Sequence, residues 1–448
     1  MKRWTPILLS LALGVSLAAC GVDGGQEGIP LLTQTDESQG RADGPGGSGG
    51  ARQGAAEERG EPTYKPEDVD PAVVAAHNAF ALDFFRDVAG REEDEPNVFL
   101  SPLSAVLALT MTMNGAEGET LGAMKQALRM DGIDDDTILA SHRALTDILA
   151  HSEGVRIDIA NSLWPDEGLV FLAPFITANQ EYYDAELTPV DLQSAEVVER
   201  VNKWVSERTE GKIGKLLNEP LKPEAILLLL NAIYFDANWS SPFPEDRTTT
   251  MPFIREDGSA VDASMMFRGG KAMYQDGDGF EAVRLPYRGH DLSMIVVVPD
   301  KGAKLSEFID GLTPQKWEKM MNSFMEASGE LGMPKFTIEY ETQLNETLSA
   351  LGMGPAFNEE TADFSRMIEN AIELGVHISS VKQKTYVDVA EQGTVAAAVT
   401  SVEAATASAP AHVFDLRVDR PFLFAIHDRR TDSILFMGAV GDPTASAK

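Results

Sequence analysis

Apolar positions at helical spacing mark the first part of the globular sequence. Between residues 71 and 89 they recur about every three or four residues, which predicts a helix. Ser101 followed by Pro102 predicts the start of a second helix, continuing over residues 103–114, because Ser is a favoured N-cap and Pro a favoured first helical residue. A further helix is predicted over residues 201–217.

Near-continuous apolar runs mark the later part of the chain, and such runs are typical of strands buried on both faces. The long runs are residues 227–235, 292–298 and 434–440, and shorter strands are expected at 385–389, 416–418 and 422–426. Helices therefore cluster early and strands cluster late. This order predicts an α+β fold rather than regularly alternating βα units.

The start of the chain has the pattern of a secretion signal. Lys2 and Arg3 precede an apolar run over residues 7–19, which is too short to cross a hydrocarbon core of ~30 Å but typical of a signal peptide. The run ends in Leu-Ala-Ala-Cys, which is similar to the bacterial lipobox. That resemblance implies removal of residues 1–19 and a lipid on Cys20. The alternative is an ordinary signal peptide with an incidental cysteine.

Residues 20–70 have the composition of a flexible linker. They are rich in Gly, Asp, Glu, Gln and Ser and cannot bury enough apolar surface to fold. A linker of this length has a root-mean-square reach of ~40 Å. We therefore expect a domain over residues 71–448, tethered to a membrane of the cell envelope and exposed to the periplasm or the extracellular space. A leader without a function remains the alternative.

Charge and motifs exclude several classes of function. The 448 residues carry a formal net charge of -33, which repels nucleic acid. The single cysteine precludes an internal disulfide framework and lies outside the domain, so it is no nucleophile there. We find no His-Glu-x-x-His, Gly-x-Ser-x-Gly, phosphate-binding or dinucleotide motif. The sequence thus predicts a protein that is not an enzyme and that binds no metal and no cofactor.

Residues 391–414 are unusually small and nearly uncharged, with Glu403 as the one charge between Glu391 and Asp415. A low-complexity linker would explain this composition. However, the segment lies between predicted strands, and a loop of this length inside a compact domain is usually functional. Thr394, Ala396, Ala398 and Thr400 would share one face of a strand, and all are small.

The string Glu-Gln-Gly-Thr-x-Ala-Ala-Ala at 391–398 resembles the hinge of the serpin reactive-centre loop. Further strings resemble the same family, in the expected order and over about 370 residues: 97–104, 114–120, 202–213, 231–235, 239, 242–243, 285–287, 333–336, 351–353 and 420–424. On these motifs the chain is identified as a member of the serpin family.

The resemblance implies a fold of helices packed on large mixed or antiparallel sheets, with an exposed reactive-centre loop. It implies an inhibitor that a target protease, either a serine or a cysteine protease, cleaves to form a covalent acyl-enzyme. The cleaved loop then inserts into the main sheet as a new strand. It also implies a monomer. The implied hinge residues are Glu391, Gln392, Gly393, Thr394, Ala396, Ala397 and Ala398.

The resemblance also implies a polar region where the sheet opens. Its members would be Ser101, Ser104, Asn231, Trp239 and Gln383. Family members commonly carry His where this chain has Gln383; Gln can also donate and accept hydrogen bonds, so the polar cluster can persist. For Asn231 and Trp239, ordinary core packing is the alternative.

Counting from Glu391 as the family does places the reactive bond between Ala407 and Ser408. A small residue at the cut suits an elastase-like or subtilisin-like protease. Ala405 and Thr406 are alternative cut sites, and a shorter second half of the loop would place the cut near Pro410. A non-inhibitory serpin, acting as a surface binding or chaperone module, is the alternative function, and an enzyme on an unrelated fold is a third.

The lipid assignment generates a first testable prediction. Cys20→Ser should release the protein from membranes or block its processing, because serine has no thiol to accept the lipid. Membrane fractionation of expressing cells measures this. Equal membrane partition with Ser at position 20 would show that the lipid assignment is wrong.

Overall fold

The structure is a computed structural model that describes residues 60–92, 95–221, 225–394 and 413–445. The α-helices are α1 (Pro71–Arg91), α2 (Pro102–Met113), α3 (Gly118–Ala127), α4 (Asp135–Ala150), α5 (Ala173–Tyr183), α6 (Ala195–Arg208), α7 (Leu305–Asp310), α8 (Pro314–Met321) and α9 (Asn345–Leu348). Short helical turns are η1 (Pro66–Asp68), η2 (Glu245–Arg247), η3 (Ser349–Met353) and η4 (Gly354–Phe357).

A nine-stranded sheet follows the order β1-β15-β14-β8-β7-β6-β9-β13, with β5 paired to β6. Its strands are β1 (Asn97–Leu100), β5 (Thr249–Ile254), β6 (Ala260–Asp276), β7 (Phe280–Pro286), β8 (Leu292–Pro299), β9 (Met325–Pro334), β13 (Val413–Arg417), β14 (Phe422–Asp428) and β15 (Ser433–Val440). Every residue of β8, β14 and β15 is buried, as expected from their continuous apolar sequences.

A six-stranded sheet follows the order β10-β11-β12-β4-β2-β3. Its strands are β2 (Val155–Pro165), β3 (Glu186–Leu187), β4 (Leu227–Asn238), β10 (Phe336–Gln343), β11 (Lys382–Val389) and β12 (Gly393–Thr394). The short strand β12 lies between β11 and β4 and is antiparallel to both. The fold is therefore α+β, with two large sheets and helices packed against them, as predicted.

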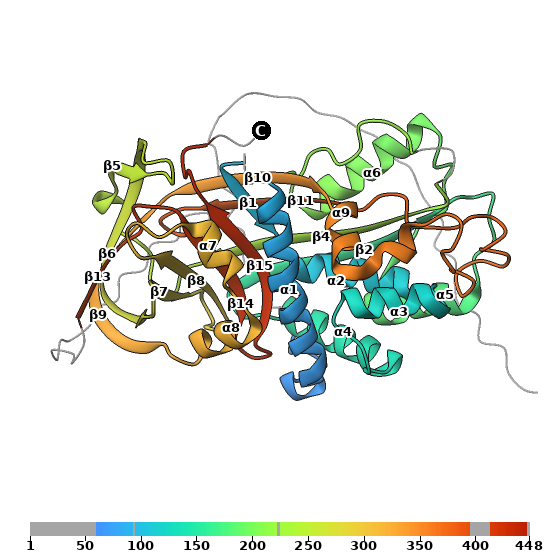
Figure 1. Cartoon of the computed structure of the whole chain (residues 1–448), viewed down its shortest axis with the longest axis horizontal. Helices are drawn as coiled ribbons and strands as arrows, with labels where there is room; N and C mark the ends of the chain where they lie inside the picture. The colour runs from blue at the N-terminus through green and yellow to red at the C-terminus, as the bar shows by residue number, and fades with distance from the viewer. Residues whose placement is uncertain (1–59, 93–94, 222–224, 395–412, 446–448) are drawn as a thin grey trace, which may run out of the picture. The chain divides into compact units, whose positions relative to one another are not determined.

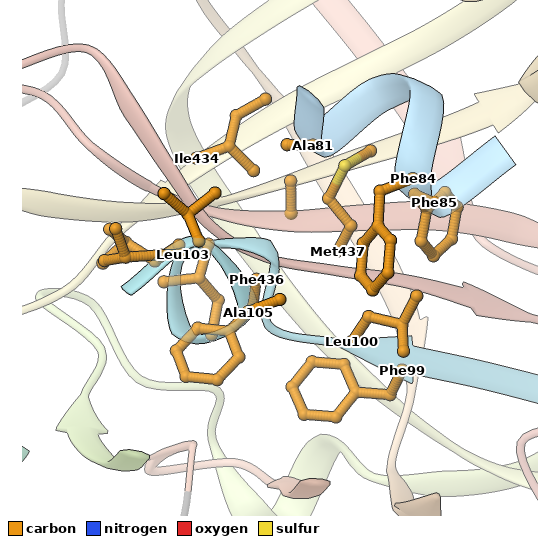
Figure 2. Close-up of a cluster of buried hydrophobic side chains, with 14 of the residues drawn as sticks. Ala81, Phe84, Phe85, Phe99, Leu100, Leu103, Ala105, Ile434, Phe436 and Met437 are labelled. Atoms are coloured by element: carbon orange, nitrogen blue, oxygen red, sulfur yellow. The ribbon is translucent and has the colours of Figure 1, made fainter. Parts of the chain in front are cut away.

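The core joins the early helices to the late strands. Figure 2 shows Phe84 of α1 and Leu103 of α2 gathered with Phe436 of β15 and Phe99 of β1. The Phe99 ring stacks on those of Phe424 and Phe436, each with centroids 5.5 Å apart. Each fully buried side chain of this kind contributes about 1.5–3 kcal/mol. In Figure 1, α1 lies across β15, so segments from opposite ends of the sequence form one core.

The predicted start of α2 is confirmed at the level of single atoms. Ser101 is the N-cap, and its Oγ accepts a hydrogen bond from the Ser104 amide at 3.2 Å. The same Oγ donates to the Leu435 carbonyl at 3.0 Å, which ties the helix start to β15. Pro102 occupies the first helical position.

The predicted helix over residues 201–217 is wrong in its bounds. Helix α6 spans Ala195–Arg208, and Glu210 and Gly211 then adopt positive φ values of 51° and 73°, which end it. The Asn202 Oδ1 accepts hydrogen bonds from the amides of Leu216 and Leu217 at 2.7 and 2.8 Å. The apolar residues after α6 therefore fold back on the helix rather than extend it.

The packed domain begins earlier than its composition suggests. The amides of Thr63 and Tyr64 both donate to Oδ2 of Asp147, at 2.7 and 3.0 Å, and Val69 is buried. Residues 63–69 thus belong to the domain, although the sequence placed them in the linker. Composition misses this because main-chain amides make the contact. Among the described residues, no helix is long and apolar enough to span a membrane.

Two buried histidines join the early helices. His77 Nε2 of α1 lies 2.8 Å from His142 Nε2 of α4, and His142 Nδ1 lies 2.9 Å from the Tyr183 hydroxyl. Burial lowers the pKa of His77 from 6.5 to about 4, and burial together with His77 lowers the pKa of His142 well below its usual value. Both imidazoles are therefore neutral in the folded protein at neutral pH.

This pair predicts a dependence of stability on pH. In the unfolded chain both histidines take up protons near pH 6.5, so the unfolded state binds more protons as the pH falls. The free energy of unfolding should be at its full value above about pH 6.5 and decline towards pH 4. Urea unfolding over this range measures it. His77→Gln should flatten the decline, whereas His290→Asn at an exposed turn should not; equal slopes in both variants would contradict the assignment.

Candidate functional site

The candidate site lies where the chain leaves the six-stranded sheet. After β11, the Ala390 amide donates to the Gly393 carbonyl at 2.9 Å, and the chain turns back as β12. Thr394 then pairs with Val389 of β11 and with Ala237 of β4. The sequence treated residues 391–414 as a loop that enters the sheet only after cleavage. In the structure, Gly393 and Thr394 already lie in the sheet.

Thr394 is held by an aromatic stack. Its side chain is buried, and its Oγ1 lies 2.8 Å from the Tyr287 hydroxyl. The Tyr287 ring stacks on Trp239, with centroids 4.6 Å apart and planes 9° apart. Burial raises the pKa of Tyr287, and this outweighs the opposing effect of the hydrogen bond to Thr394. The phenol therefore keeps its proton.

Trp239 holds the turn before β12 as well as packing in the core. Its indole Nε1 donates to the Ala390 carbonyl at 3.0 Å, and its amide donates to the Gln392 carbonyl at 2.9 Å. The side chain itself is buried against Tyr287. Trp239 therefore packs in the core, as one interpretation held, and also bonds the turn before β12. A role of Trp239 in loop insertion stays a prediction.

Position 393 requires a residue without a side chain, because its backbone lies very close to the backbone of β4. A Cβ at this position would lie 2.1 Å from the Ala237 carbonyl oxygen and 2.7 Å from Asn238 Cα. Both neighbours are main-chain atoms of β4 and cannot move aside alone. A glycine here therefore lets β12 lie against β4.

Glu391 is fixed by charge and hydrogen bonds. Its Oε2 lies 2.7 Å from Lys335 Nζ, and its Oε1 accepts a hydrogen bond from Thr248 at 2.8 Å. Burial opposes ionisation, but the contacts with Lys335 and Thr248 outweigh it and hold the pKa of the carboxyl below its usual value. Gln392 contacts Glu245 at 3.4 Å. The residues before β12 are thus anchored through Lys335, which lies between β9 and β10.

Gln383 makes the polar contact that the sequence left open. Its Oε1 accepts from the Ser101 amide and its Nε2 donates to the Ser101 carbonyl, both at 2.9 Å. The Thr385 hydroxyl donates to the Phe99 carbonyl at 2.6 Å. β11 is therefore bound to the start of α2 and to β1 by side-chain to main-chain bonds. Ser104 is buried nearby on α2.

Asn231 lies in β4 opposite Asn161 of β2, and its side chain falls outside what the structure describes. Ala396, Ala397 and Ala398, the bond between Ala407 and Ser408, and Cys20 also lie outside the described residues. The predictions for these positions stay predictions.

A small cavity of about 10 Å³ lies beside Thr394. Its walls are Ile233 and Phe235 of β4 together with Thr385 and Val387 of β11. A volume of this order holds about one water molecule. β4 and β11 thus leave a narrow space between them beyond the C-terminal end of β12.

Three members of this site were not assigned a role from the sequence: Tyr287, Thr248 and Lys335. Tyr287 and Lys335 stand in strings that resemble the family, but neither string says what the side chain contacts. Thr248 stands in no such string.

Comparison with known proteins shows the family to which the chain belongs. Residues 75–443 match the family model described as Serpin (serine protease inhibitor). An uncharacterised serpin-like protein of Thermococcus kodakarensis is 34% identical over 384 residues, covering 84% of this chain and 87% of its own. Human antithrombin-III is 29% identical over 401 residues, covering 87% of this chain and 86% of its own.

Among solved structures, the native state of tengpin, a thermophilic serpin, superposes with a TM-score of 0.76 at 31% identity. The match covers 85% of this chain and 97% of tengpin. The chain therefore belongs to the serpin family and has the serpin fold. Family and fold suggest protease inhibition rather than catalysis.

The close approach at Gly393 generates a prediction. Gly393→Ala should expel β12 from the sheet, because the new Cβ would meet backbone oxygen of β4. Hydrogen exchange of the amides around Ala237 and Trp239 should then become faster by about tenfold or more.

Gly90→Ala is the matched control, since a Cβ at this position of α1 meets no atom within 4 Å. It should leave exchange in β4 unchanged. Unchanged exchange in Gly393→Ala would show that β12 does not depend on the missing Cβ.

Proposed function

We propose that this protein inhibits serine proteases by the serpin mechanism: the loop after β12 is cleaved as an acyl-enzyme and then inserts into the six-stranded sheet. One observation carries the proposal, namely that the first residues of the hinge already occupy the position of the new strand. β12 pairs in register with β11 on one side and β4 on the other. Insertion would extend this strand rather than start one.

The register tells where the following residues would go. Thr394 lies opposite Ala237 and Val389, so in an antiparallel strand Ala396 would lie opposite Phe235 and Val387. By the same step Ala398 would lie opposite Ile233 and Thr385. These four partners line the small cavity beside Thr394. The next inward-facing hinge residues would therefore enter a space that is already outlined.

Small side chains suit that space. The cavity of about 10 Å³ is closed from behind by Phe99, Ile426 and Phe436, so a large residue would force the core apart. Alanine adds little volume and loses no side-chain entropy on burial. Charged or bulky residues at these positions would favour the alternative, a non-inhibitory serpin that serves as a binding module.

The hydrogen bonds of β11 bear on how the sheet opens. Continuing the register brings Thr400 opposite Gln383, whose amide group bonds both main-chain groups of Ser101. An advancing strand must slide past this point. Gln383 in place of the family's usual histidine keeps the cluster hydrogen-bonded without a group that titrates near neutral pH.

The setting and target belong to the same proposal. We infer that a lipid on Cys20 tethers the domain to a membrane of the cell envelope. The bond between Ala407 and Ser408 would be offered to an elastase-like or subtilisin-like protease, whose shallow pocket accepts alanine.

Opposite faces of the hinge give a sharp test. Ala396→Arg should strongly reduce the covalent complex while leaving the loop cleavable, because insertion would bury the charge between β4 and β11. Ala397→Arg is the matched control: it adds the same charge, but its side chain points to the opposite face of the inserted strand. A denaturing gel after incubation with the protease measures the trapped fraction.

We expect the fraction of protease trapped by Ala396→Arg to fall at least about tenfold relative to wild type. Ala397→Arg should trap nearly as well as wild type. Equal trapping by both variants would contradict insertion. Clean cleavage of the wild type with no complex would instead support the non-inhibitory alternative.

The reactive bond has its own test. Mass spectrometry of the fragment released on reaction should give a new N-terminus at Ser408. Ala407→Arg should shift inhibition towards trypsin-like proteases, which require a long cation in the acidic pocket. A new N-terminus at another residue would move the reactive bond and leave the insertion mechanism intact.

A further inference from the structure

Arg268 of β6 contacts the chain segment that lies against the hinge. Its Nη1 donates a hydrogen bond to the Ser241 carbonyl, and its Cζ lies 5.1 Å from the centroid of the Phe243 ring. Ser241 and Phe243 follow β4 of the six-stranded sheet, whereas Arg268 belongs to the nine-stranded sheet. One side chain therefore joins the nine-stranded sheet to the segment that leaves β4.

Residues 239–243 hold the hinge through main-chain hydrogen bonds. The Trp239 amide donates to the Gln392 carbonyl at 2.9 Å. The Phe243 amide donates to the Glu391 carbonyl, also at 2.9 Å. Phe243 stands between two prolines, which have no amide hydrogen, so its own amide is the main-chain donor of this stretch. The position of Phe243 therefore decides where the Glu391 carbonyl is held.

The charge of Arg268 is not neutralised by an ion pair within the part of the chain that the structure describes. Burial lowers the pKa of Arg268 to about 10, and no described carboxylate opposes this effect. Arg247 and Arg417, by contrast, both contact the carboxylate of Glu330. A desolvated cation without a counter-ion costs free energy, which a carbonyl and a ring face offset only in part. The contacts of Arg268 are thus directed at Ser241 and Phe243 rather than at an opposite charge.

The held stretch lies directly before the strand that insertion would extend. β12 begins at Gly393, and Thr394 pairs with Val389 and Ala237. A shift of the Glu391 carbonyl would therefore move Thr394 out of this register. Because insertion would compete with hydrolysis of the acyl-enzyme, a hinge already in register favours insertion.

We propose that Arg268 is a positioning residue for loop insertion, because it holds Ser241 and Phe243 and, through the Phe243 amide, the Glu391 carbonyl. This inference rests on the proposed inhibition. The role does not require Arg268 to touch the protease. Without Arg268 the hinge would enter the sheet later, and more of the acyl-enzyme would be hydrolysed before it is trapped.

Hydrogen exchange of the uncleaved, full-length protein tests the hold on the hinge without any protease. In Arg268→Met the Phe243 amide should exchange about tenfold faster than in wild type, because its bond to Glu391 would open more often.

Arg284→Met is the matched control. Arg284 also lies over a phenylalanine ring, that of Phe324 at 4.7 Å, and its Nη2 donates to a main-chain carbonyl, that of Met321 at 2.9 Å. These partners belong to the end of α8 and the segment after it, so exchange at Phe243 should stay at the wild-type rate.

The outcome of the reaction with a protease tests the role in insertion. In Arg268→Met the ratio of trapped to hydrolysed product should fall about fivefold, whereas the rate of loop cleavage should stay within about twofold of wild type. Arg284→Met should leave the ratio unchanged, even if both variants lower the thermal midpoint. Arg268→Lys should recover part of the ratio, because lysine keeps a cation over the Phe243 ring.

The two measurements separate this inference from the proposed inhibition. Unchanged exchange at Phe243 in Arg268→Met would overturn the inference, as would an equal fall of the ratio in Arg284→Met. Faster exchange with an unchanged ratio would mean that the contact is structural only, and would also overturn it. In each of these cases a wild type that traps protease leaves the proposed inhibition intact. A wild type that traps none would overturn both.

Discussion

Thr394 lies where the six-stranded sheet is joined across its middle. Its backbone pairs with β11 on one side and β4 on the other, and its hydroxyl meets Tyr287 on the stack formed with Trp239. Within the described sheet, β12 is the strand that connects the two halves. The described hinge residues and the cavity beside them are both positioned around Thr394.

The start of β12 is held in place, and a small cavity lies beyond it. Glu391 is fixed by Lys335 and Thr248, and Gly393 is fixed by the main chain of β4, so the start of the strand cannot drift. The cavity beside Thr394 is lined mostly by apolar side chains, so under the proposed mechanism only small residues could enter it. The alanine-rich sequence of the loop meets this requirement. Because β12 is fixed at its start and has space only beyond Thr394, the proposed insertion would extend the strand from its C-terminal end.

Local signals made much of this fold predictable. The Ser101 cap, the apolar runs that form β4, β8 and β15, and the motifs that resemble the family can all be read from short stretches of sequence. The contacts between Thr394 and Tyr287 and between Glu391 and Lys335 join residues far apart in the chain, and only the register of the strands brings them together. Composition also placed residues 63–69 in the linker, because it is blind to main-chain bonds with Asp147.

Loop insertion in serpins releases stored strain. A rise in thermal stability after cleavage is therefore the most direct consequence of the proposed mechanism. The decisive measurement is the thermal midpoint of the protein before and after clean cleavage within residues 401–410. The account predicts a sharp rise, because the freed loop would extend β12 between β4 and β11 and bury its small face. An unchanged midpoint after complete cleavage would mean that the loop does not insert, and the inhibitory mechanism would be contradicted.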